Sequence, residues 1–136
     1  MKTLLLVLVC VAGLTGVAAA QSALNEGQGH PLKGIWIGDW GPDKAKRTPV
    51  LIELNWDGKA ITGAINPGPN ALPLTKATLD SATWMVHLEA ERKEGAAKPS
   101  QAVIDGRLEN IGAYRRVLSG TWTQNGQKGQ FRLVLN

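Results

Sequence analysis

The sequence has little of what catalytic and metal sites are built from. Among its 136 residues there are one cysteine, two histidines, one tyrosine and one phenylalanine. The cysteine, Cys10, lies within the first twenty residues, so the rest of the chain can form no disulfide and depends on its core for stability. Two histidines without a further cysteine leave no zinc or copper pattern. No serine lies in a Gly-x-Ser-x-Gly segment. We therefore predict no metal, no cofactor and no enzyme activity.

Long apolar runs are also scarce, and the one that exists lies at the start of the chain. Lys2 precedes an apolar run over Leu4–Val11, and Ala18-Ala19-Ala20 offers the small residues that signal peptidase recognises. We predict a cleavable signal peptide over residues 1–20 and a periplasmic or secreted protein. The alternative, a retained membrane anchor, is disfavoured because two glycines and a threonine interrupt the run. We expect no transmembrane segment after cleavage.

The sequence also lacks a large excess of positive or negative charge. Fifteen basic residues face eleven acidic ones, a net charge of +4, or +3 without Lys2. This balance is too weak to argue for a nucleic-acid partner. The 116 residues after the signal peptide suit one domain. We expect a flexible arm over the polar, glycine-rich residues 21–31 and a single domain over 32–136.

Helical periodicity is absent, and short segments of period-two alternation take its place. Sixteen glycines and seven prolines recur too often for a long helix. Asp57-Gly58 and Asn125-Gly126 are typical of tight hairpins, and longer polar connections separate the other segments. The expected strands are Leu32–Trp40, Val50–Trp56, Ala60–Ile65, Leu72–Leu79, Thr83–Ala90, Gln101–Leu108, Arg116–Thr123 and Gln130–Leu135.

The alternation also predicts how these strands close. Five tryptophans and five glycines fall on the predicted inward face. A narrow barrel is filled when residues with large side chains alternate with glycines, which have none. Closure removes exposed strand edges. We therefore predict an all-β fold, a single antiparallel up-and-down β-barrel of about eight strands. The inward residues are Trp36, Trp40, Trp56, Trp84 and Trp122, with Gly34, Gly38, Gly63, Gly106 and Gly120.

Several segments resemble a known type of domain. Gly34-Ile35-Trp36 resembles the Gly-x-Trp opening of lipocalins and avidin-like barrels, and Ile61–Ile65 resembles the third strand of avidins. Leu118–Gln124 and Gly129–Leu133 resemble the ending of small exported bacterial barrels of unassigned function. The resemblance implies a lipocalin- or avidin-like barrel and the binding of something small and apolar. It does not extend to biotin, because Ile65 stands where avidins have a ligand-binding tyrosine.

The tryptophan face has two interpretations, a filled core or the lining of a ligand pocket. An empty apolar pocket of about 300 Å³ would cost roughly 7 kcal/mol. That cost is comparable with the whole stability of a domain, about 5–15 kcal/mol. A domain without disulfides can hardly leave its whole lumen empty. The estimate favours a filled core, with a partial pocket near one end as the alternative.

Basic residues gather at one end of the predicted barrel. In a meander alternate loops lie at the same end, so residues 41–49, 66–71, 91–100 and 125–128 share one rim, which we call the basic rim. Trp40 would lie just beneath it. Clustered positive charge on long loops favours an anion, although lysines that only keep the protein soluble are the alternative. The rim residues are Lys44, Lys46, Arg47, Arg92 and Lys93, together with Lys98 and Lys128.

Three classes of function remain open from the sequence. The first is a non-enzymatic binding module for a small apolar or anionic amphiphile at one barrel mouth, with the five tryptophans and the basic rim as its candidate site. The second is a protein-interaction barrel, such as an inhibitor of a secreted enzyme or the partner of an envelope protein. The third is a structural envelope component. We expect His87 to be a solvent-facing strand histidine, because it alternates outward between Val86 and Leu88.

Overall fold

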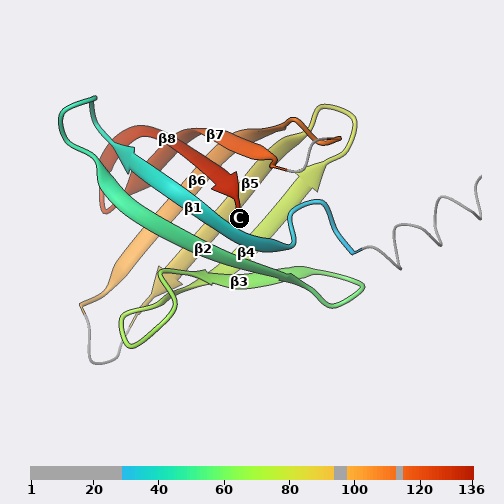
Figure 1. Ribbon diagram of the computed structural model, residues 1–136. Coiled ribbons are helices and arrows are strands. Elements are labelled where there is room, and N and C mark those ends of the chain that lie inside the picture. Colours follow the sequence, from blue (N-terminus) through green and yellow to red (C-terminus); the bar gives the residue numbers. More distant parts are fainter. Residues whose placement is uncertain (1–28, 94–97, 113–114) are drawn as a thin grey trace, which may run out of the picture. The chain divides into compact units, whose positions relative to one another are not determined.

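The alternating segments form eight antiparallel strands that close into one up-and-down barrel in the computed structural model (Figure 1). Each strand pairs with the next in sequence, and the last pairs with the first. The predicted fold class is therefore confirmed. The strands are β1 (Gly34–Gly41), β2 (Thr48–Trp56), β3 (Ile61–Ile65), β4 (Leu72–Asp80), β5 (Met85–Arg92), β6 (Ser100–Glu109), β7 (Val117–Gln124) and β8 (Gln127–Leu135).

The structure describes residues 29–93, 98–112 and 115–136. The predicted signal peptide and residues 21–28 of the predicted arm lie outside this part of the chain. The barrel forms one compact unit over Pro31–Asn136. Within the described part, no helix has the length and apolar character needed to cross a membrane.

Local chemistry explains where the strands turn. Asn125 and Gly126 have φ angles of 50° and 85°, the left-handed conformations that a two-residue hairpin requires. At the other predicted hairpin only Gly58 has a positive φ, 96°, and the carboxylate of Asp57 accepts the amide hydrogens of Lys59 and Ala60, both at 2.7 Å. The dipeptides therefore mark both turns, but with different turn geometries.

Three residues expected in strands, Leu32, Thr83 and Trp84, lie in turns. Leu32 precedes β1 in a turn, yet its side chain is fully buried in the core. Trp84 precedes β5 with a φ of 60°, and hydrogen bonds fix it there: its amide donates to Asp80 O and its carbonyl accepts from Leu108 N. Because burial and turn hydrogen bonds can hold a side chain on the inward face, the alternation predicted the face correctly but not the local backbone.

The lumen of the barrel is filled by apolar side chains from every strand. No polar or charged side chain is buried among the described residues. The largest fully buried side chains are those of Trp36 and Trp122, followed by leucines and isoleucines from β2, β5, β6, β7 and β8. The interpretation of the tryptophans as core is therefore correct for most of them. A core of this kind stabilises the fold chiefly by removing apolar surface from water.

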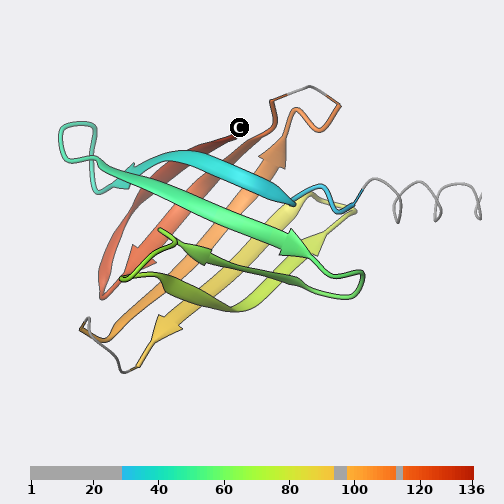
Figure 2. The same cartoon turned by 60° about the horizontal axis from the view of Figure 1, so that its bottom comes forward.

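The pairing between β3 and β4 is much shorter than either hairpin that flanks it. Only two pairs are in register, Ala64 with Pro73 and Ile65 with Leu72. A bulge between Leu74 and Lys76 then changes which residues of β4 face the lumen. In Figures 1 and 2 the β2–β3 and β4–β5 hairpins diverge toward the end opposite the basic rim. The barrel is closed, but this junction is its weakest.

Candidate functional site

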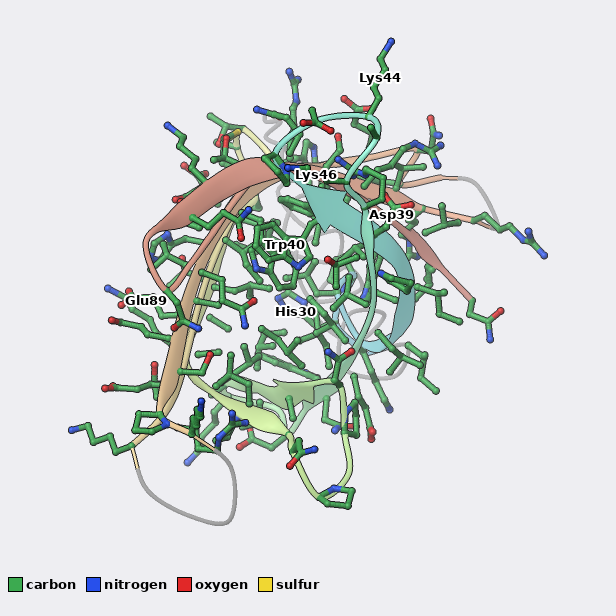
Figure 3. All side chains as sticks on the ribbon, turned by 90° about the vertical axis from the view of Figure 1, so that its left-hand side faces the viewer. His30, Asp39, Trp40, Lys44, Lys46 and Glu89 are labelled. Atoms are coloured by element: carbon green, nitrogen blue, oxygen red, sulfur yellow. The ribbon has the colours of Figure 1, made fainter. Side chains whose placement is uncertain are left out.

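Three aromatic side chains are packed together at the mouth beneath the basic rim. The rings of Trp40 and Trp122 are stacked, with centroids 5.5 Å apart and planes 13° from parallel. Phe131 meets Trp122 edge to face at 5.8 Å and 71°. Figure 3 looks into this end and shows Trp40 inside the ring of strands. Both contacts have the geometry that aromatic quadrupoles favour, so the cluster is a packed closure of the mouth.

The inner tryptophan of this cluster is held by a polar chain that runs to the rim. The indole Nε1 of Trp122 donates to Gln124 Oε1 at 3.0 Å, and Gln124 Nε2 donates to Ser100 Oγ at 3.3 Å. Asn125 Nδ2 also donates to Ser100 Oγ, at 3.1 Å. Trp122 has no exposed surface, whereas Trp40 keeps 8 % of its surface exposed. Trp40 is therefore the member of the cluster that a ligand at the mouth would meet first.

The other predicted tryptophans do not belong to this mouth. Trp36 is buried in the barrel and donates its indole hydrogen to Leu32 O at 2.8 Å. Trp56 ends β2 and Trp84 precedes β5, so both lie toward the opposite end. Both are only partly buried. The five tryptophans are thus divided between the mouth, the central core and the far end.

The structure also divides the predicted basic rim into two groups. Arg47 pairs with Asp39 at 2.7 Å and donates to Gly41 O at 3.3 Å, which secures the β1–β2 loop. Arg92 donates to Lys98 O and Asn70 O, both at 2.8 Å, and so ties two loops together. These hydrogen bonds give both arginines a structural role in the rim loops, and their part in ligand binding stays a prediction.

The rim lysines are disposed differently. Lys44, Lys46 and Lys93 are exposed. Within the described residues no ion pair involves the first two. Figure 3 shows Lys44 projecting outward, away from the mouth. The positive charge of these lysines is therefore carried by exposed side chains on the rim loops.

A shallow surface depression lies beside the mouth, with a volume of about 320 Å³. It is lined by the end of β5, the start of β6 and Asn125 of the β7–β8 turn. Arg92 and Lys93 contribute to it, and Glu91 opposes their charge. The depression is open to solvent and more polar than apolar in its lining, so it suits a polar headgroup better than an apolar chain.

Sequence reasoning missed a cluster on the outer face of β5 and β6. His87 Nδ1 lies 2.5 Å from Asp105 Oδ1, and its Nε2 lies 2.8 Å from Glu89 Oε2. His87 and Asp105 are paired across the two strands. The two-residue spacing of His87 and Glu89 already places them on one face of β5. Asp105 joins them only through the register between β5 and β6, which the sequence does not show. Among the described residues no group of three His, Cys, Asp or Glu side chains is arranged to hold a metal ion.

This cluster predicts a pH-dependent contribution to stability. Hydrogen bonds to Asp105 and then to Glu89 raise the pKa of His87 above its ordinary value. Because the pKa of His87 is higher in the folded state than in the unfolded state, the cluster contributes its full stabilisation at a pH below the unfolded-state pKa of about 6.5. It is lost as the pH rises through the folded-state value. We expect less than about 1 kcal/mol, because the ring is about one-third exposed and solvent screens the ion pairs.

The measurement is urea unfolding of the wild type and of His87→Gln from about pH 5 to about pH 9. Glutamine keeps a donor for one carboxylate but cannot carry the charge. The stability difference should be largest at the acidic end and vanish at the alkaline end. A difference that stays constant across this range would show that the imidazolium charge contributes nothing.

Comparison with known proteins leaves the barrel without an assigned relative. No family model, no curated protein and no solved structure matches the chain. The architecture itself, eight antiparallel strands in a closed up-and-down barrel, is consistent with a lipocalin- or avidin-like fold.

Proposed function

We propose that this protein is a non-enzymatic, exported binding module for a small apolar or anionic amphiphile, which it takes at the mouth beside Trp40. The observation that carries the proposal is the aromatic cluster at this mouth, with its outermost member, Trp40, slightly exposed beneath lysine-bearing loops. The apolar part of the ligand would contact the exposed edge of Trp40. Its anionic group would be attracted by Lys44 and Lys46.

The packed lumen limits the size of such a ligand. Trp122 and Phe131 occupy the space beneath Trp40, so a ligand either lies over Trp40 or displaces it. The proposal is therefore a shallow site for an amphiphile and not a deep lumen that encloses one.

The test is titration of the protein with laurate while indole emission is recorded. We expect saturable quenching or a blue shift, because the acyl chain would cover Trp40. The double variant Lys44→Ser/Lys46→Ser should bind laurate about fivefold more weakly, with a flatter salt dependence, since two exposed charges are worth about 1 kcal/mol together.

Lys59→Ser/Lys76→Ser is the matched control, because it removes the same charge away from the rim. It should bind laurate as the wild type does. If both double variants weaken laurate binding equally, only the net charge of the protein matters and the rim has no specific role. If laurate leaves the indole emission spectrum unchanged, the proposal is wrong.

A second function, a protein-interaction barrel, is favoured by a different observation. Only two residue pairs join β3 to β4, so the rest of the facing edges lies outside the ladder. Unpaired edges are the usual places where a strand from another chain adds to a sheet.

A further inference from the structure

Exposed apolar side chains gather on the outer wall of the barrel, where β8, β1 and β2 lie side by side (Figure 1). Ile35 and Ile37 on β1 are 41 % and 44 % exposed. Ile37 is paired with Leu51 of β2 and with Val134 of β8, and both of these are partly exposed. We call these four residues the apolar stripe. Single exposed apolar residues are common, but a contiguous group across three strands is typical of an interaction surface.

Two opposite charges border the apolar stripe at diagonal positions. Arg132 precedes Val134 by two residues on β8, and Glu53 follows Leu51 by two residues on β2. Because β8 and β2 are both antiparallel to β1, the two charged side chains lie at opposite corners about Ile37. Both are exposed, and within the described part of the chain neither takes part in an ion pair.

The charges around this stripe favour a second copy of the chain as its occupant. Asp39, beside Arg132, is bound by Arg47 at 2.7 Å. Lys33 lies two residues before Ile35, beyond the end of β1, and adds one positive charge at the border. A chain with a net charge of +4 repels its own copies. Self-association is therefore least opposed on a face where free charges of both signs are present, and most opposed at the lysine-bearing rim.

The diagonal arrangement makes this face complementary to itself. Consider a two-fold axis in the plane of contact that passes beside Ile37, at right angles to the line from Arg132 to Glu53. It places Arg132 of each copy opposite Glu53 of the other and packs Ile37 against its own counterpart. Two-fold contacts of this kind, in which the same patch serves both subunits, are the commonest in soluble homo-oligomers.

We infer that the apolar stripe is the contact between two copies of this chain. Its apolar side chains form the centre of the contact, and Arg132 and Glu53 form part of the polar rim that surrounds such a centre. Three strands about 4.8 Å apart, with about four residues of each, cover roughly 200 Å² of wall. A stable interface buries about 800 Å² per partner, so we expect a weak dimer with a dissociation constant on the order of 100 µM. The inference goes beyond amphiphile binding and does not depend on it.

Sedimentation equilibrium of the protein, purified after export, tests the inference between about 5 µM and about 500 µM, a range that brackets the expected constant. The average mass should rise from that of one chain toward that of two. Ile37→Lys should weaken association at least tenfold, because two charges would then meet at the centre of the contact. Met85→Lys is the matched control: Met85 is 47 % exposed on β5, outside the stripe, and the same substitution there should leave association unchanged.

Charge reversal tests the pairing across the contact. Arg132→Glu and Glu53→Arg each turn two attractions of the dimer into repulsions, so each should weaken association about tenfold. An equimolar mixture of the two variants should restore it, because both pairs across the mixed dimer again join opposite charges. Both positions are exposed, so neither change is expected to prevent folding.

Three results would overturn the inference. The first is the mass of a single chain over the whole concentration range, which would leave the stripe to solvent or to a different protein. The second is a dimer that Ile37→Lys leaves unchanged. The third is a mixture of Arg132→Glu and Glu53→Arg that associates no better than either variant alone. Laurate titration at the lowest protein concentration, where the chain is monomeric, measures the proposed binding function separately.

Discussion

Replacing Trp122 with alanine should destabilise the barrel by about 4 kcal/mol, the usual cost of deleting a large buried aromatic side chain. The side chain has no exposed surface and contacts both Trp40 and Phe131. Its loss leaves a cavity at the mouth and removes the hydrogen bond to Gln124. Because no disulfide supports residues 21–136, this loss is a large fraction of a typical stability of about 5–15 kcal/mol.

Urea unfolding followed by circular dichroism measures this effect. Met85→Ala serves as the control, because Met85 is 47 % exposed and its truncation should change stability by no more than about 0.5 kcal/mol. Trp122→Phe should fall between the two, since it keeps an aromatic ring but loses part of the stack. A loss below about 1 kcal/mol for Trp122→Ala would contradict the packed mouth and revive the open pocket.

Replacing Gly120 with alanine should cost about 3 kcal/mol, although it adds only one methyl group. Gly120 has a φ of 155°, which side chains rarely adopt. A Cβ there would lie 2.6 Å from the Cα of Gly106 and would overlap the carbonyl oxygen of Asp105. These are backbone atoms held in the β6–β7 ladder, so they cannot rotate away as a side chain would.

The reason for this glycine lies on the two neighbouring strands. Gly106 and Gly120 face each other on β6 and β7, and Phe131 pairs with Gly120 from β8. A Cβ on Gly106 would lie 2.7 Å from the end of the Phe131 ring. Gly106 therefore leaves room for the Phe131 ring of the aromatic cluster, and Gly120 allows the close approach of the β6 backbone.

Gly112→Ala is the matched control for Gly120→Ala. A Cβ at Gly112 meets nothing within 4 Å, so this variant should unfold within about 0.5 kcal/mol of the wild type. Urea midpoints of the two variants measure the comparison. Equal stability of both would show that the strands at Gly120 are less closely packed than the structure has them.

The laurate-binding prediction does not depend on these stability changes, because the rim variants alter only exposed lysines. Loss of laurate binding in Lys44→Ser/Lys46→Ser addresses the mouth. Lys59→Ser/Lys76→Ser is the control, so a general effect of charge on laurate binding would be visible in that variant as well.

The apolar pattern on β4 shows which features of this strand can be predicted from the sequence. Leu72 and Leu74 are two apart, but Ala77 follows after three, a break in the period that marks a bulge. That signal was present in the sequence and predicts which residues face inward. The loss of pairing between β3 and β4 was not predictable, because it depends on how far the two hairpins diverge in space.

The roles of Arg47 and Arg92 illustrate the same limit. Both were counted as charge for a ligand, since composition and topology place them at the rim. In the structure Arg92 reaches the carbonyl of Asn70, twenty-two residues away in the chain. Which carbonyl a guanidinium reaches depends on the spacing of loops that are distant in sequence, and alternation along one strand carries no information about it.

The sequence by itself determined the number of strands, their approximate ends, the meander and the inward face, because each follows from side chains two residues apart and from local turn chemistry. Only the tertiary structure decided that two rim arginines are bound, that Trp40 stacks on Trp122, that His87 lies between two carboxylates, and that the wall is weakly joined between β3 and β4. Those contacts join residues on different strands and loops, and their distances are set only when the barrel closes.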